Sequence, residues 1–267
     1  MITTTDFREP REKPGASRMA IAGKNEDLQR IVVLNPKGGC GKTTIATNIA
    51  SYIALRGPMP VLLDCDPQGG AMSWLEKRSR LRAPVHGIAA YRKPLNMTRT
   101  WQLRVPSQSR HVVVDTPAGL EGPQIHDLVY DATNVLIPVM PSPIDIRYAA
   151  RFIAELLLVA QLDRGSVRVG IVASRTRQNS RALKQLMRFL TSLRIPVVAL
   201  LRDSQNFVRA ADEGIGVCDM PLYKAKEDIV AMADVVAWLD RTAPRQELPV
   251  LMPADEPARR GDTLPLL

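Results

Sequence analysis

Residues 34 to 44 read LNPKGGCGKTT and place glycines, two lysines and two threonines in one turn. A glycine-rich turn between a strand and a helix lets backbone N–H groups close on nucleotide phosphates, and the helix N-terminus favours the anion. We expect Lys42 to reach the β- and γ-phosphates, Thr43 to bind Mg²⁺ and Thr44 to lie near the α-phosphate. The predicted phosphate site comprises Gly38, Gly39, Cys40, Gly41, Lys42, Thr43 and Thr44.

This loop departs from the common pattern at its start. Pro36 stands where a first glycine is expected, and a second lysine, Lys37, follows it. A second cation near the γ-phosphate would stabilise the charge that develops during phosphoryl transfer. The alternative is that Lys37 faces solvent.

Two further apolar runs end in carboxylates. Asp64 and Asp66 close the run 60–65, and Asp115 closes the run 111–116. Ligands of open parallel sheets bind outside the carboxyl ends of the strands, so these acids should face the same phosphates. Asp115 has the position of a Walker B acid that holds Mg²⁺, Asp66 is placed to orient an attacking water, and Asp64 is a structural or Mg²⁺-side group. One such acid would be an ordinary turn residue, but three features in this order favour a catalytic site.

The elements that must position these groups alternate along the chain. Apolar runs bounded by turn residues alternate with segments of helical period, which is typical of βαβ units. The sequence therefore predicts an α/β fold, a single doubly wound, mostly parallel sheet with helices on both faces. The predicted strands are 30–35, 60–65, 111–116, 134–140, 167–174 and 195–201, and the predicted helices are 42–56, 123–131, 145–161, 179–191, 205–213 and 225–240. Residues 80–110 sustain neither period.

The ends of the chain differ in composition from its centre. We predict a flexible N-terminal arm at 1–28, one ATPase domain at 29–242 and a proline-rich flexible tail at 243–267. The arm lacks the apolar segment that a secretory signal requires. No apolar run in the sequence reaches the roughly 18 to 20 residues that a membrane span needs. The three cysteines form no CxxC pair, which favours a reducing cytoplasm without disulfides or zinc.

Positive charge is concentrated in one stretch of the chain. The formal net charge is +9, and the segment 164–209 holds ten basic residues and one acid, Asp203. A second basic run lies at 77–104. Such clustering favours a polyanionic partner such as nucleic acid.

The motifs KGGCGKTT, DCDPQGG and VVVDTPAG, taken together, resemble those of the ParA/MinD family of deviant Walker A ATPases, over about residues 30 to 240. The resemblance implies ATP and Mg²⁺ as cofactors and ATP hydrolysis as the activity. It also implies an ATP-dependent sandwich homodimer in which Lys37 crosses to the partner's ATP, so that Lys37, Lys42 and Asp66 are the catalytic residues and Thr43, Asp64 and Asp115 the metal-side residues. Many relatives have Asn-Arg where this chain has Ser174-Arg175, so no adenine contact is assigned.

Within the family, the sequence favours the DNA-binding ParA branch. The proline-rich tail lacks the basic amphipathic helix of MinD-like proteins, so no membrane partner is expected. A basic stripe on the helix 179–191 is predicted to meet phosphates of double-stranded DNA without sequence preference, away from the nucleotide, and consists of Arg177, Arg181, Lys184 and Arg188.

Two functions remain open at this point. The first is a cytoplasmic, nucleoid-associated ATPase that positions a cargo (a plasmid, a chromosome region or a protein assembly) with a ParB-like or McdB-like adaptor that stimulates hydrolysis. The segment 137–161 is similar to ParA-like proteins that position carboxysomes. The second is a DNA-binding regulator or filament former in which ATP is only a dimerisation switch.

Overall fold

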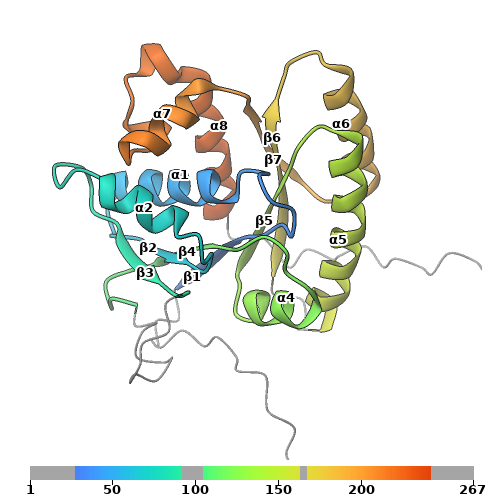
Figure 1. Ribbon diagram of the computed structural model, residues 1–267, viewed down its shortest axis with the longest axis horizontal. Helices are drawn as coiled ribbons and strands as arrows, with labels where there is room; N and C mark the ends of the chain where they lie inside the picture. Colours follow the sequence, from blue (N-terminus) through green and yellow to red (C-terminus); the bar gives the residue numbers. More distant parts are fainter. Residues whose placement is uncertain (1–27, 92–104, 163–166, 242–267) are drawn as a thin grey trace, which may run out of the picture.

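The computed structural model describes residues 28–91, 105–162 and 167–241. A seven-stranded sheet with the order β3-β2-β4-β1-β5-β6-β7 forms its centre, and every described strand pair is parallel (Figure 1). The strands are β1 (Gln29–Val33), β2 (Val61–Asp64), β3 (His86–Ala89), β4 (His111–Asp115), β5 (Asn134–Val139), β6 (Arg168–Thr176) and β7 (Val197–Arg202).

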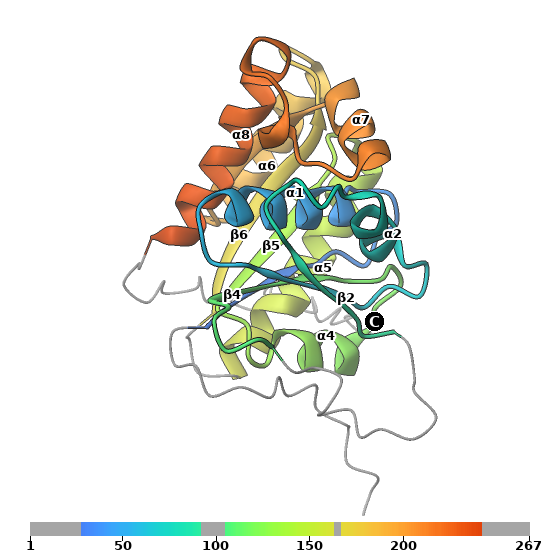
Figure 2. The ribbon, with the colours of Figure 1, turned by 90° about the vertical axis from the view of Figure 1, so that its left-hand side faces the viewer.

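Helices cover both faces of the sheet, as Figures 1 and 2 show. One face carries α1 (Lys42–Leu55), α2 (Gly70–Lys77), α7 (Gln205–Glu213), η1 (Val217–Asp219) and α8 (Leu222–Asp240). The other carries α4 (Gly122–Val129), α5 (Pro143–Leu162) and α6 (Arg181–Ser192). Each layer of helices encloses its own apolar core against the sheet, which explains why the strands are apolar on both faces.

Local sequence signals fix where several helices begin. Ser180 accepts a hydrogen bond from the Leu183 N–H at 3.1 Å, and Ser204 accepts one from the Asn206 N–H at 3.2 Å, so serines cap α6 and α7. Such a cap stabilises a helix by about 1 kcal/mol. Gly214 ends α7 with φ +64°, a left-handed conformation in which glycine carries no Cβ penalty.

The predicted fold class is confirmed, and each of the six strands and six helices expected from the sequence is present within a few residues. The sequence did not reveal α2 and β3, which are eight and four residues long. Length alone is not the reason, because β2 and α4 are equally short. β3 buries only Ile88, and α2 buries only Ala71 and Trp74, so neither shows a clear apolar pattern. The predicted arm and tail lie outside the described residues, except for Leu28.

Candidate active site at the carboxyl edge of the sheet

The carboxyl ends of three neighbouring strands bring the predicted site residues together. Asp64 at the end of β2 is the register partner of Asp115 at the end of β4, and Val33 at the end of β1 is the partner of Asp115 on the other side. The glycine loop follows β1 directly. The three acidic and glycine motifs, which are far apart in sequence, therefore meet at one edge of the sheet.

The glycine loop has the backbone that a phosphate cradle needs. Gly39 and Gly41 have φ values of +74° and +97°, so a side chain at either position would be strained. Lys42 begins α1, is 7% exposed, and its ammonium donates to the Lys37 carbonyl at 2.9 Å. This bond folds Lys42 back over the loop, where a phosphate would meet its charge.

Neighbouring segments hold the loop in place. The Gly119 N–H donates to the Pro36 carbonyl at 2.7 Å, and the Ser174 hydroxyl donates to the Cys40 carbonyl at 2.8 Å. The Cys40 thiol points into the protein toward the Lys37 carbonyl at 3.3 Å, and burial raises its pKa. Cys40 is thus available to a phosphate through its backbone N–H and not through its thiol.

Asp115 is the strongest candidate for a magnesium ligand. Neither of its buried carboxylate oxygens has a hydrogen-bond partner among the described residues, and burial raises its pKa to about 7. The Thr43 hydroxyl is near enough to oppose this shift, although it does not reach hydrogen-bond geometry. A carboxylate and a hydroxyl are oxygen donors of the kind Mg²⁺ prefers, so Thr43 and Asp115 fit this ion. A bound Mg²⁺ would supply positive charge to the β- and γ-phosphate oxygens.

Asp64 and Asp66 differ in their surroundings. The Asp64 carboxylate accepts hydrogen bonds from the backbone N–H groups of Asp66 and Met72, both at 3.0 Å, and burial raises its pKa. It thereby anchors the start of α2, which supports the structural alternative over a metal-side role. Asp66 lies in the turn before α2, where one carboxylate oxygen accepts the Gln68 N–H at 3.0 Å. Its position beside Asp115 is consistent with a group that orients water.

Lys37 and Lys42 have different partners. Its ammonium forms an ion pair with Asp145 of α5, and the Ser142 hydroxyl donates to the other oxygen of the same carboxylate. The Lys37 side chain is 29% exposed, whereas that of Asp145 is 6% exposed. Lys37 is therefore held at the rim of the site by a partner that the sequence did not indicate. Lys37 is thus ion-paired and only partly exposed, and does not extend freely into solvent.

A cavity of about 380 Å³ opens beside the loop, and it was not foreseen from the sequence. It lies between the loop, the end of β6 and the start of α7, and its lining includes Gly41, Thr44, Arg175, Asp203, Ser204 and Phe207. Arg175 has φ +51°, a conformation unusual for a residue with a side chain. The only sequence signal for this cavity was the presence of Ser174-Arg175 where many relatives have Asn-Arg.

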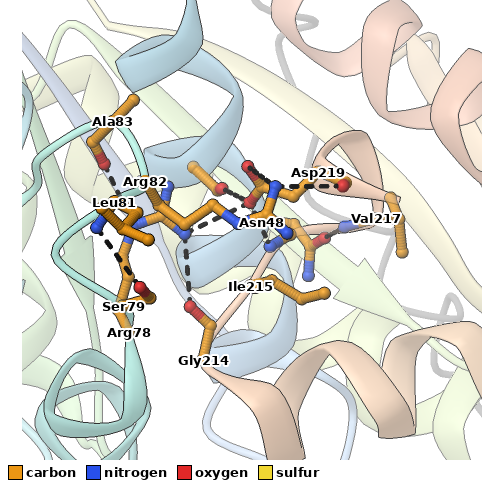
Figure 3. A network of polar contacts seen from close by, with 12 residues as sticks. Asn48, Arg78, Ser79, Leu81, Arg82, Ala83, Gly214, Ile215, Val217 and Asp219 are labelled. Carbon is orange, nitrogen blue, oxygen red and sulfur yellow. Dashed lines mark hydrogen bonds and ion pairs between the residues drawn. The ribbon is translucent and has the colours of Figure 1, made fainter. Parts of the chain in front are cut away.

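A buried polar network fixes α2, and with it the turn that holds Asp66 (Figure 3). The guanidinium of Arg78, at the end of α2, donates to the Gly214 carbonyl and to the Asp219 carboxylate, both at 3.2 Å. The Ser51 hydroxyl of α1 and the Gly216 N–H donate to the same carboxylate. Burial alone would raise the pKa of Asp219, but these bonds together lower it. The network ties α2, α1 and η1 together behind the site.

The predicted DNA-binding residues are exposed, but they do not form one stripe. Arg181, Lys184 and Arg188 lie on the exposed side of α6. Arg177 lies outside this helix, directly after β6, and pairs with Asp203 at 3.1 Å. The expectation that all four residues lie away from the strand ends is therefore wrong for Arg177, because the β6–α6 turn begins at the carboxyl edge.

No described helix is long and apolar enough to cross a membrane. In the same part of the chain, no group of three or more histidine, cysteine or acidic side chains is arranged to hold a metal ion. A Mg²⁺ site built from one carboxylate, one hydroxyl and the nucleotide's own oxygens does not require such a group.

The fold and the site define a P-loop nucleotide-binding protein of the doubly wound α/β class. Residues 31–217 match the CobQ/CobB/MinD/ParA nucleotide binding domain, and the chain belongs to this family. It is accordingly an ATPase of the ParA/MinD type.

Three comparisons place the chain within the family. It is 30% identical over 188 residues, 70% of this chain and 85% of the relative, to maintenance of carboxysome distribution protein A of Halothiobacillus neapolitanus. It is 31% identical over 224 residues, 82% of this chain and 98% of the relative, to the protein of the same name from Gloeobacter kilaueensis. An ATP complex of a McdA variant from Cyanothece has the same fold, with a TM-score of 0.58 at 14% identity, covering 79% of this chain and 97% of that chain.

Proposed function

We propose that this chain is a positioning ATPase that forms a sandwich homodimer with ATP and Mg²⁺, binds nucleoid DNA without sequence preference, and releases it after hydrolysis. In this cycle a ParB-like or McdB-like adaptor on the cargo stimulates hydrolysis. The released monomer then rebinds ATP slowly, so that occupied DNA is depleted around the cargo.

One observation carries the proposal: the two loop lysines have different partners. Lys42 is folded onto the loop by its bond to the Lys37 carbonyl, whereas the Lys37 ammonium is paired with Asp145 of α5. A lysine that served only the local phosphates would duplicate Lys42. The division supports a local role for Lys42 and a role across a dimer for Lys37, once the pair with Asp145 opens.

The cavity beside the loop supports a place for the nucleoside. Thr44 and Gly41 line its inner end, next to the predicted α-phosphate position, and Phe207 supplies an apolar wall. A volume of about 380 Å³ lies within the range of small-molecule sites. We infer that adenine enters here, between the β6–α6 turn and the start of α7, with Arg175 and Asp203 at its rim.

The relatives favour a protein assembly as cargo. The two carboxysome distribution proteins align over 70% and 82% of this chain, far more than the nucleotide motifs alone. We therefore infer a carboxysome or a similar large assembly in preference to a plasmid or a chromosome region.

The deciding experiment measures ATP turnover of the full chain alone, with duplex DNA, with a candidate adaptor, and with both. The positioning cycle requires that the adaptor accelerate turnover severalfold, most strongly when DNA is present. Turnover that stays unchanged under all four conditions, while ATP still drives DNA binding, would favour the regulator or filament former instead.

A further inference from the structure

The strand β7 forms one edge of the sheet. Among the described strands, β7 pairs only with β6, so one row of its backbone N–H and C=O groups has no strand beside it. Its sequence, VVALLR, carries no charge before Arg202, and the Arg202 guanidinium already binds Asp228 and Glu227. Protein edge strands are normally blunted by charges, prolines or bulges. Pro196 precedes β7, and the β6–β7 pairing shifts register at two places. The strand itself nevertheless has no proline and no charge before Arg202, so its apolar residues remain a candidate site of association.

A groove runs along this edge between α6 and α8. It has a volume of about 490 Å³, and its lining includes Met187 of α6, four successive residues of β7 (197–200) and Val230 of α8. Leu200 is 42% exposed and Val230 is 51% exposed. Apolar side chains thus stay in water along the strand that also offers free backbone groups.

Three charged residues line the groove, and one of them, Glu227, is already paired with Arg202. The other two are arranged symmetrically. Lys226, Val230 and Asp234 follow one another at four-residue spacing on the exposed side of α8, with a cation at one end and an acid at the other. The two charged residues are about 12 Å apart along the helix. Neither has an ion-pair or hydrogen-bond partner in the part of the chain that the structure describes. Both are available to an external group.

We propose that the β7 edge binds the β7 edge of a second copy of this chain across a two-fold axis. Two copies of α8 that run antiparallel, with the axis at Val230, place Lys226 of each copy opposite Asp234 of the other. The same axis passes near the middle of the groove floor, so the two β7 strands pair antiparallel and the sheet continues from one copy into the next. A two-fold interface needs a surface complementary to itself, and a cation and an acid placed symmetrically about an apolar centre satisfy this condition.

This contact lies on a different surface from the ATP-dependent dimer. Lys37 and the nucleotide loop are at the carboxyl edge of the sheet, whereas the groove follows the length of β7 and α8. The edge contact needs no nucleotide. A chain that makes both contacts links ATP dimers into linear assemblies.

The test is a charge exchange, measured by sedimentation velocity of the full chain without nucleotide over a range of concentrations. Wild-type protein should self-associate, and Lys226→Asp or Asp234→Lys should each weaken association about tenfold or more, because like charges then face each other twice. An equimolar mixture of the two single variants should associate again, since each unlike pair is restored between different chains. The double variant K226D/D234K should associate by itself.

Two controls separate this contact from the proposed function. Lys224→Asp reverses an exposed charge near the start of α8 outside the groove and should leave association unchanged. Lys42→Ala should also leave it unchanged, because ATP is not needed.

A wild-type chain that stays monomeric overturns the proposal, and so does association that survives both single reversals. Loss of association that mixing does not restore contradicts the two-fold geometry and favours an extended segment of another protein as the occupant of the edge.

Discussion

At the scale of single residues, neighbouring groups of the site have different surroundings. Lys42 is buried and bonded inside the loop, and Lys37 is partly exposed and paired to another helix. Asp64 accepts two backbone N–H groups around the start of α2, whereas Asp66 accepts only the Gln68 N–H in the turn before it. We therefore expect substitutions of Lys37 and Lys42, and of Asp64 and Asp66, to have different effects.

Lys42→Ala is expected to abolish ATP binding, because several phosphate charges lose their cationic partner. Titration calorimetry of the monomer with ATP and Mg²⁺ measures this. Wild-type affinity retained within a factor of a few would contradict the assignment of the loop.

Asp66→Ala is expected to bind ATP and to dimerise, yet to hydrolyse at least about tenfold more slowly, because its carboxylate orients water without being the main Mg²⁺ ligand. Single-turnover assays with radiolabelled ATP give the rate of the chemical step. Glu76→Ala, an exposed acid on α2, is the matched control and should keep the wild-type rate. Loss of ATP-dependent dimerisation in the Asp66 variant would assign it a different role.

At the scale of elements, the two helices of greatest interest are α2 and α6. Helix α2 is short and is fixed from behind by Arg78 and Asp219, whose side chains are 3% and 0% exposed. Helix α6 packs through Leu186 and Leu190 and leaves its basic side to solvent. The first helix positions the site, and the second offers a surface.

Asp219→Asn is expected to lower the free energy of unfolding by about 3–5 kcal/mol at neutral pH, because the buried Arg78 loses its counter-charge. The folded-state pKa of Asp219 is lowered, so its contribution is present above the ordinary aspartate pKa and is lost as pH falls below about 4. Urea unfolding at several pH values should therefore show that the difference in the free energy of unfolding between wild type and variant shrinks in acid.

The control is Asp240→Asn, which breaks the exposed pair with Arg56. It should lower the free energy of unfolding by at most about 1 kcal/mol. Equal effects of the two substitutions would show that the buried network has no special role.

Reversal of any two of Arg181, Lys184 and Arg188 to glutamate is expected to weaken binding to unrelated DNA duplexes alike, because phosphate contacts carry little sequence information. ATP binding should stay intact, since this part of the stripe lies on α6. Fluorescence anisotropy with two duplexes of different sequence measures both affinities. Lys77→Glu with Arg80→Glu is the matched control, and if that pair alone abolishes binding, the DNA contact lies on the second basic run.

At the scale of the whole molecule, ATP, dimerisation and DNA binding are expected to be coupled through Lys37. Lys37→Ala should bind ATP as a monomer and fail both to form the sandwich dimer and to hold DNA, because the cation that crosses to the partner's phosphates is missing. Light scattering with and without ATP measures the dimer. A normal ATP-dependent dimer in the variant would contradict the cross-dimer role.

The affinity of the wild-type dimer for DNA should depend on salt. With on the order of 4 to 8 phosphates neutralised per dimer, the logarithm of the affinity should fall against the logarithm of the salt concentration with a slope of about −4 to −7.

The sequence by itself determined the fold class, the phosphate loop and the order of the acidic motifs. These features can be recognised from residues adjacent in sequence. Gly39 and Gly41 indicate a turn that only glycine adopts without strain. An apolar run that ends in Asp115 indicates a strand with an acid at its carboxyl end. Parallel sheets bury both faces of their strands, so six strands were visible as continuous apolar runs. β3 and α2 were not, because β3 buries one residue and α2 buries two, which gives no clear apolar pattern.

Only the tertiary structure decided which groups meet. The partner of Lys37 is Asp145, and the partner of Arg78 is Asp219, each more than one hundred residues away, and no sequence spacing encodes such pairs. The cavity beside Thr44 is built from the glycine loop, the ends of β6 and β7, and α7, which are far apart in sequence. The separation of Arg177 from α6 depends on where Ser180 caps the helix. The open edge at β7 is a property of strand order. Strand order is set by packing of the whole chain, because a strand's own residues look the same at the centre of a parallel sheet and at its edge.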